Sequence, residues 1–126
     1  MGDFIIDATQ KSPSVKLLYN EGLFELKGNS ILEDPETFYN PIIDKLDEYL
    51  HPTRESTTVI IYLTYYNSGT VRSLISLFKM IEKHHKQGEK ISIQWHYKSN
   101  DTVLKEDGID YNKLVDVPFQ LVERDD

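Results

Sequence analysis

The stretch TTVIIYLTYYNSGTVRSLISLFKMI, residues 57–81, contains two different periodicities joined by a short polar junction. Residues 57–66 are almost all β-branched or aromatic and carry no charge, which predicts a central strand covered on both faces. After Asn67, apolar residues recur at the spacing of an amphipathic helix, and Gly88 supplies its stop signal. A buried strand leading directly into such a helix is typical of α/β folds. The apolar helix positions are Val71, Leu74, Ile75, Phe78 and Ile81.

The segment before this stretch predicts a β-hairpin. Residues 15–19 and 23–27 are strand-like and flank Asn20-Glu21-Gly22, a short loop that contains glycine. We expect Gly28-Asn29-Ser30 to break the second strand. Residues 1–14 hold serine, threonine and proline, and predict an irregular lead-in.

Two helix-start signals compete in the next segment. Asp34-Pro35 and Asn40-Pro41 each place a capping residue before proline. Because proline inside a helix removes a hydrogen bond and costs about 3 kcal/mol, we predict a turn over 34–39 and a helix from Pro41 to Leu50. Residues 51–54 would end that helix. Its apolar face comprises Ile42, Ile43, Leu46, Tyr49 and Leu50.

The C-terminal third predicts a strand, a short helix and a second strand. Residues 91–97 alternate between apolar and polar side chains, as in a strand with one apolar face. Residues 101–117 are polar and predict a short helix around Tyr111. Residues 118–122 form an expected last strand, and the acidic tail 123–126 is expected to be frayed.

Together these elements predict a single domain over residues 1–126, with an α/β fold. Helices that alternate with strands in the second half favour parallel strands there, joined to the antiparallel N-terminal hairpin. We therefore expect a small sandwich in which helices pack on a mixed sheet.

Composition narrows the class of partner and the compartment. Acidic residues outnumber basic ones 21 to 14, giving a net charge of −7, which argues against nucleic acid and anionic membranes as partners. The chain has no cysteine, so disulfides and thiolate metal sites are excluded. The first residues lack the basic start and long apolar core of a signal peptide. We expect a cytoplasmic protein.

The histidines and carboxylates do not predict a catalytic or metal site. His84 and His85 are adjacent and point about 100° apart on a helix, so we expect solvated side chains near its C-terminus and no bound metal or cofactor. The positions of Asp44, Asp47 and Glu48 fit the solvent-exposed face of a helix. A solvated acidic loop is expected around Asp101, Glu106, Asp107 and Asp110. We therefore do not expect an enzyme.

The junction after residue 66 carries the functional hypothesis. Ser68 precedes the helix, where a serine commonly serves as the N-cap by accepting a backbone N–H bond. The same position also suits a phosphorylated serine, because free N–H groups at a helix start stabilise a charge of about −2. Gly69 would keep access to the hydroxyl open, and Arg72 could pair with the phosphate.

Several segments together cover nearly the whole chain: TQKSPSV (9–15), GNSILEDPETFYNPIIDKLDEYL (28–50), IIYLTYYNSGTVRSLISLFKMIEKHHKQG (60–88), ISIQWHY (91–97) and PFQLV (118–122). These segments resemble the SiaC family of regulatory phosphoproteins, small bacterial proteins that are similar to anti-sigma-factor antagonists of the STAS type.

The resemblance implies a STAS-like domain that switches partners and has no catalysis of its own. A Ser/Thr protein kinase of the histidine-kinase-like ATPase type would phosphorylate the hydroxyl after the junction asparagine, and a PP2C-type phosphatase would remove the phosphate. This places the phosphoacceptor at Ser68, with Thr70 as the second choice. The unphosphorylated form would bind an output protein, in some systems a diguanylate cyclase. The expected partner surface comprises Tyr65, Tyr66, Asn67, Gly69 and Arg72.

Two other functions stay open at this point. One is a constitutive STAS-type module that binds a protein or a small ligand, in which Ser68 only caps a helix. The other is a small hydrolase that uses the acidic residues. Neither Tyr65 nor Tyr66 decides between them, because both also suit half-buried strand positions.

Overall fold

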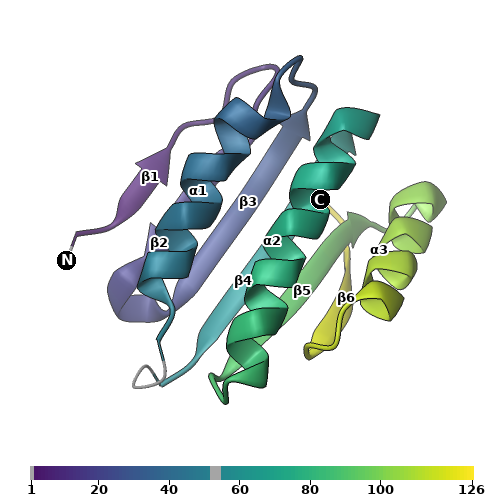
Figure 1. Ribbon diagram of the computed structural model, residues 1–126. Coiled ribbons are helices and arrows are strands. Elements are labelled where there is room, and N and C mark those ends of the chain that lie inside the picture. The colour runs from purple at the N-terminus through teal and green to yellow at the C-terminus, as the bar shows by residue number, and fades with distance from the viewer. Residues whose placement is uncertain (1, 52–54) are drawn as a thin grey trace.

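The computed structural model describes residues 2–51 and 55–126, which form a six-stranded sheet with three helices on one face (Figure 1). The strands are β1 (Phe4–Ile6), β2 (Ser14–Leu18), β3 (Leu23–Ser30), β4 (Thr57–Tyr66), β5 (Ile91–Lys98) and β6 (Phe119–Arg124). The helices are α1 (Pro35–Tyr49), α2 (Ser68–Lys86) and α3 (Thr102–Leu114), and a short 3-10 turn, η1 (Tyr19–Glu21), links β2 to β3.

The strands lie in the sheet in the order in which they occur in the sequence. β1, β2 and β3 pair antiparallel, whereas β3, β4, β5 and β6 pair parallel. The predicted hairpin, mixed sheet and α/β class are confirmed. Because the helices connect parallel strands, the carboxyl ends of β3 to β6 and the N-termini of α1 and α2 meet at one edge of the sheet.

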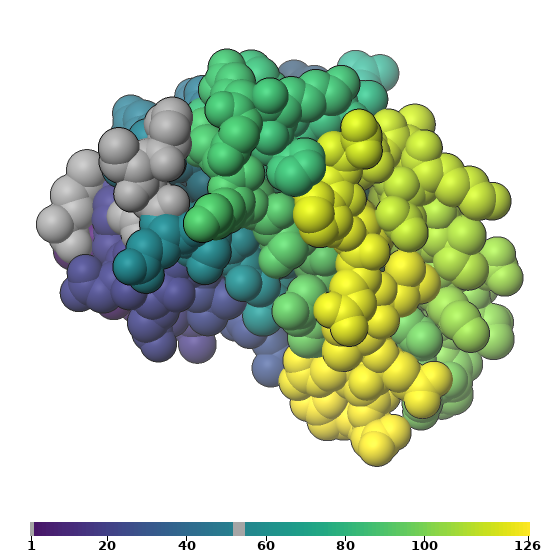
Figure 2. Space-filling view, turned by 90° about the horizontal axis from the view of Figure 1, so that it is seen from below, coloured from purple at the N-terminus to yellow at the C-terminus, as the bar shows by residue number. Residues whose placement is uncertain are grey.

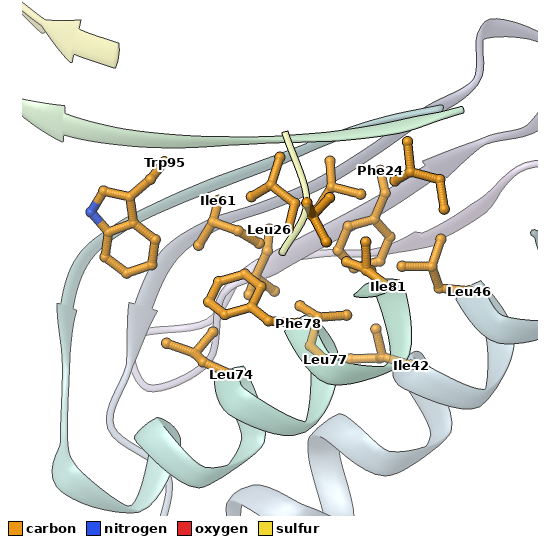
Figure 3. Close-up of a cluster of buried hydrophobic side chains, with 14 of the residues drawn as sticks. Phe24, Leu26, Ile42, Leu46, Ile61, Leu74, Leu77, Phe78, Ile81 and Trp95 are labelled. Atoms are coloured by element: carbon orange, nitrogen blue, oxygen red, sulfur yellow. The ribbon is translucent and has the colours of Figure 1, made fainter. Parts of the chain in front are cut away.

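The hydrophobic core lies between the helices and the face of the sheet that they cover (Figure 3). Phe24, Leu26, Ile61 and Trp95 project from the strands toward the helices, where Phe78 packs against Trp95 with ring centroids 6.5 Å apart. The alternation predicted for β5 contributes to this core, as do Leu74, Phe78 and Ile81 of the predicted α2 stripe. Val71 is only half-buried, and Leu77, which was not predicted, is 1% exposed.

β4 is a central strand, as predicted, but its cover on the two faces differs: helices cover one face only. None of the helices formed by residues 2–51 and 55–126 lies on the other face of the sheet (Figure 1). There Tyr62 is 3% exposed, because Arg124 lies over its ring at 4.5 Å and its hydroxyl donates to the carbonyl of Asp126 at 2.6 Å. The C-terminal tail is therefore ordered rather than frayed: β6 runs to Arg124, whose guanidinium pairs with Asp126 at 2.8 Å.

Helix α1 begins earlier than predicted and contains Pro41. Asp34 caps it by accepting from the N–H of Thr37, and Pro35 occupies the first turn, where its missing N–H costs nothing. Within this helix Tyr39 is 1% exposed, and its hydroxyl lies 2.7 Å from the Oγ of Ser30. Pro41 lies on the exposed side of the helix, where water can satisfy the freed carbonyl. Packing thus overrides the local cost of proline.

The boundaries of three other segments also differ from the predictions. β1 pairs with β2 where an irregular lead-in was expected. β3 does not break at Gly28 but continues to Ser30 through a bulge, with Gly28 at a φ of 126°. α1 ends at Tyr49 with Leu50 as its C-cap, and residues 52–54 of its predicted stop signal lie outside the described residues.

Helix α3 spans thirteen residues, so the helix predicted around Tyr111 is confirmed but longer than expected. Asp101 caps it by accepting from the N–H of Leu104 at 3.0 Å. Within residues 2–51 and 55–126, no helix combines the length and the apolarity that a membrane crossing requires.

Candidate functional site

The junction between β4 and α2 lies at the edge of the sheet where the parallel strands end (Figure 1). Asn67, and not Ser68, is the N-cap of α2: its backbone is extended, and its Oδ1 accepts from the N–H of Thr70 at 3.3 Å. The amide nitrogen of Asn67 also donates to the carbonyl of Leu32 at 3.0 Å. The capping role predicted for Ser68 was therefore wrong, because asparagine caps as well as serine and here gains a second anchor.

Ser68 is the first residue of α2 and is exposed. Among the hydrogen bonds of the described residues, none involves its hydroxyl. The first backbone N–H groups of a helix have no carbonyl partner within the helix, and they favour negative charge. Ser68 thus combines an accessible hydroxyl with the N-terminal end of a helix, which favours negative charge.

Thr70 lies in a buried network of hydroxyl groups beneath the junction. Its side chain is 0% exposed, and its Oγ1 lies 2.8 Å from the Oγ of Ser30 and 3.0 Å from the Oδ1 of Asn67. The Oγ of Ser30 in turn lies 2.7 Å from the hydroxyl of Tyr39. Burial raises the pKa of Tyr39 to about 12, partly offset by this hydrogen bond, so its phenol stays protonated. The network fixes β3, α1 and α2 relative to one another.

Gly69 has a packing role at the same edge. A Cβ atom at this position would lie 3.1 Å from the Cγ of Pro35. This distance is shorter than an ordinary van der Waals contact, so glycine allows the N-termini of α1 and α2 to approach closely. The sequence predicted access to the hydroxyl as its role, whereas the contact that it permits is between helices.

Arg72 lies one turn after Ser68 on α2. Its guanidinium is 4.0 Å from the Oε1 of Glu36, and both side chains are largely exposed. Exposed pairs of this kind contribute little, about 0–1 kcal/mol. Because the pair is weak and residues four apart share a helix face, the guanidinium can be redirected to a charged group on Ser68.

The two tyrosines of the predicted partner surface differ in their surroundings. Tyr65 is 59% exposed. Tyr66 is half-buried, and its hydroxyl donates to the Oδ2 of Asp107 at 2.7 Å and lies 3.3 Å from the hydroxyl of Tyr111. Burial and these two hydrogen bonds raise the pKa of Tyr66, so it remains a neutral donor.

The acidic segment predicted as a solvated loop is part of helix α3. Asp107 is half-buried beside Tyr66, and Asp110 is exposed one turn later. The prediction failed because it judged the carboxylates by charge alone. Both line a hollow of about 390 Å³ together with Ser68. Ser68 also lines a neighbouring hollow of about 350 Å³, together with Asp34 and Glu36.

His84 is buried rather than solvated as predicted. Its Nδ1 lies 2.6 Å from the Oε2 of Glu89, and its Nε2 lies 2.5 Å from the Oδ1 of Asp47. Burial by itself lowers the pKa of His84, but the two carboxylates outweigh it, so the pKa is raised overall. This cluster joins α1 to the end of α2. Within the part of the chain that the structure describes, no three histidine or acidic side chains converge on a possible metal position.

The opposite edge of the sheet faces the viewer in Figure 2, where the end of α2 (green) lies near β6 (yellow). A hollow of about 460 Å³ lies there, lined mainly by the starts of β4 and β5 and the turn after α2. None of the predicted site residues lines it. Ser68 and the tyrosines therefore belong to a different edge from this hollow.

Comparison with known proteins identifies the family. A model described as SiaC family regulatory phosphoprotein matches residues 6–124. The chain belongs to the SiaC family. The resemblance drawn from the sequence is thereby confirmed.

Members of the SiaC family with solved structures share this fold. The crystal structure of apo-SiaC from Pseudomonas aeruginosa superposes with a TM-score of 0.89 at 21% identity, covering 97% of this chain and 99% of the other. SiaC in a crystal structure with the diguanylate cyclase SiaD, whose activator it is, superposes with a TM-score of 0.90 at 20% identity, covering 97% and 100%. An uncharacterized protein of P. aeruginosa strain UCBPP-PA14 is 21% identical over the full length of both chains.

Proposed function

We propose that this SiaC-family chain is a phosphorylation-controlled regulator that switches between protein partners. Its unphosphorylated form binds an output protein of the diguanylate cyclase class, and phosphorylation of Ser68 ends that binding. The observation that carries the proposal is the exposed Ser68 hydroxyl, free of hydrogen bonds within the described structure, at the first position of α2. The chain acts by binding and supplies no catalysis.

Phosphoryl transfer would be carried out by the partner enzymes. A Ser/Thr kinase of the histidine-kinase-like ATPase type transfers the γ-phosphoryl group of ATP to the Oγ of Ser68. The bond from the γ-phosphorus to its bridging oxygen breaks, ADP leaves, and the hydroxyl proton passes to a base of the kinase. A PP2C-type phosphatase returns the serine by hydrolysis and releases phosphate. We place this cycle in the cytoplasm, where ATP is available.

Burial supports Ser68 over Thr70 as the acceptor. A kinase must bring the γ-phosphorus within bonding distance of the acceptor oxygen, and Thr70 is 0% exposed with its hydroxyl bonded to Ser30. Reaching Thr70 would require the first turn of α2 to unfold. Ser68 needs no such movement.

The surroundings of Ser68 suggest what a phosphate would do. The free N–H groups at the start of α2 stabilise the new charge, and Arg72 can leave its weak pair with Glu36 to bind it. The phosphate would also lie close to Asp34, Asp107 and Asp110. The charge and the shape of this edge would change while the helix stays formed.

The expected partner surface lies on the same edge. Tyr65 offers exposed apolar area, and Tyr66, Asn67 and Gly69 shape the surface around Ser68. The P. aeruginosa SiaC that superposes on this chain is an activator of the diguanylate cyclase SiaD, which supports a cyclase as the class of output protein here.

The test compares three variants for binding to the diguanylate cyclase encoded in the same genome. We expect Ser68→Ala to keep binding and Ser68→Asp to lose it. Ser76→Asp is the matched control, because Ser76 is another exposed serine of α2 and the change adds the same charge. Equal binding by the Ser68→Asp and Ser76→Asp variants would contradict the proposed switch.

A further inference from the structure

The edge around Ser68 contains three adjoining hollows. The hollows of about 350 and 390 Å³ share Ser68. A third hollow of about 240 Å³ adjoins the second, because Tyr66 and Asp107 line both. We call the residues that line these three hollows the acidic edge.

The charge of the acidic edge is strongly one-sided. Its acidic members are Asp34, Glu36, Asp101, Asp107 and Asp110, and its one basic member is Arg72. Asp34 and Asp101 cap helices, and Glu36 is weakly paired. Asp110 is exposed, and no hydrogen bond or ion pair in the described part of the chain involves it. This edge therefore presents uncompensated negative charge.

The acidic edge also holds exposed apolar surface. Four large hydrophobic side chains of the described residues are exposed, and two of them, Tyr65 and Val103, line the third hollow. Their exposed fractions are 59% and 69%. Apolar side chains gathered in a hollow and rimmed by charge mark a site of protein interaction.

We propose that the acidic edge binds a basic segment of the output protein, with an arginine in the second hollow and an apolar side chain between Tyr65 and Val103. This rests on the proposed function, since the segment belongs to that partner. The second hollow suits a guanidinium because two tyrosines, Tyr66 and Tyr111, line it together with the carboxylate residues Asp107 and Asp110. Planar guanidinium groups stack on aromatic rings and form paired hydrogen bonds with carboxylates, whereas an ammonium group does neither as well.

The position of Ser68 links this docking surface to the switch. Ser68 lines the second hollow together with Asp107 and Asp110. A phosphate would by its charge attract an arginine, so its effect here is steric: it fills part of the space that the partner's arginine requires, and it draws Arg72 away from Glu36 to the same place. Modification therefore acts directly at the docking surface and needs no change elsewhere in the domain.

Peptide binding to the unphosphorylated chain tests this surface without the output protein. The probe is a short amidated peptide with arginine and leucine on one helical face. Two control peptides carry lysine or glutamate in place of arginine. Titration followed by amide NMR should shift the signals of residues 64–72 and 101–111 with the arginine peptide. The lysine peptide should bind more weakly than the arginine peptide, and the glutamate peptide should not bind.

Two charge-neutralising double variants distinguish a specific binding site from general attraction to an acidic protein. The double variant Asp107→Asn with Asp110→Asn should bind the arginine peptide at least about tenfold more weakly, because two charge-assisted hydrogen bonds are lost. Asp44→Asn with Glu48→Gln removes the same charge from the exposed side of α1 and should weaken it less than about threefold. Equal weakening by both pairs, or shifts centred outside the acidic edge, would overturn the proposal.

The same two pairs, tested against the cyclase, link the surface to its partner. The acidic-edge pair should lose binding and the α1 pair should keep it; full binding by the acidic-edge pair would overturn the assignment of this surface. Because these measurements use unphosphorylated protein, a negative result would not contradict Ser68 as the phosphoacceptor. A failure of Ser68 to accept phosphate would likewise leave the docking surface standing.

Discussion

Replacing Asn67 by alanine should destabilise the domain by about 2 kcal/mol, whereas replacing Ser68 should not. Loss of the cap on Thr70 costs about 1 kcal/mol, and loss of the bond to the Leu32 carbonyl costs about 1 more. The Thr70 hydroxyl keeps its partner Ser30, so it adds little. For Ser68→Ala we expect a change within about 0.5 kcal/mol.

Urea unfolding followed by circular dichroism measures this difference. With a slope of about 2 kcal/mol per molar urea, the midpoint of Asn67→Ala should fall by about 1 M. The control is Ser76→Ala, which removes another exposed hydroxyl of α2 and should behave as Ser68→Ala does. A loss of about 1 kcal/mol in Ser68→Ala, with Asn67→Ala unchanged, would return the cap to Ser68 and refute the described junction.

Three further predictions concern the buried groups. Thr70→Val should lower the free energy of unfolding in urea by about 1–2 kcal/mol, because a buried hydroxyl network loses a member. Intact-mass analysis of this variant after kinase treatment should still find one phosphate. A variant without phosphate would point to Thr70 as the acceptor. Gly108→Ala should lower the melting temperature, because the added Cβ would lie 2.4 Å from the Cδ1 of Trp95. Such overpacking costs about 1–3 kcal/mol, whereas glycine to alanine in a helix usually stabilises by up to about 1 kcal/mol. An unchanged or raised melting temperature would contradict the contact with Trp95. The raised pKa of His84 stabilises the fold at low pH, so the free energy of unfolding should fall as pH rises above about 6.5. The difference between the native chain and His84→Gln isolates this effect, and a difference that does not change with pH would contradict it.

The sequence predicted the elements whose signal is local. β4, α2 and β5 were predicted with nearly correct bounds, because β4 is an uncharged run of mostly β-branched and aromatic residues, α2 has a helical period and β5 alternates. The pairing of β1 with β2 and the order of the C-terminal tail depend on contacts with distant residues, such as the bond from Tyr62 to Asp126, 64 positions apart. No local pattern reports such contacts.

Helix α1 shows a second limit of local signals. A strong rule against proline inside helices moved the predicted start to Pro41, although Asp34-Pro35 was an equally good start. The burial of Tyr39 and its bond to Ser30 decide between the two starts. Both depend on the end of β3, which was predicted at residue 27 although the strand continues to Ser30.

The candidate site was predicted in part. The junction residues follow directly from the change of period, so Ser68 and its neighbours were identified. Asp107 and Asp110 were missed as site residues because they belong to α3, and Asp107 meets Tyr66 across 41 positions of sequence. Their spacing of three residues, together with Tyr111, was the available signal for a helix that presents carboxylates on one side.

Phosphate mapping tests the central claim of a switch at Ser68 most directly. The purified chain is incubated with ATP and the Ser/Thr kinase encoded nearest to it, and any modified peptide is fragmented in a mass spectrometer. The account predicts one phosphate, on Ser68, and none in the Ser68→Ala variant. An unmodified chain with a kinase shown to be active on another substrate, or a phosphate on a different residue, would contradict it.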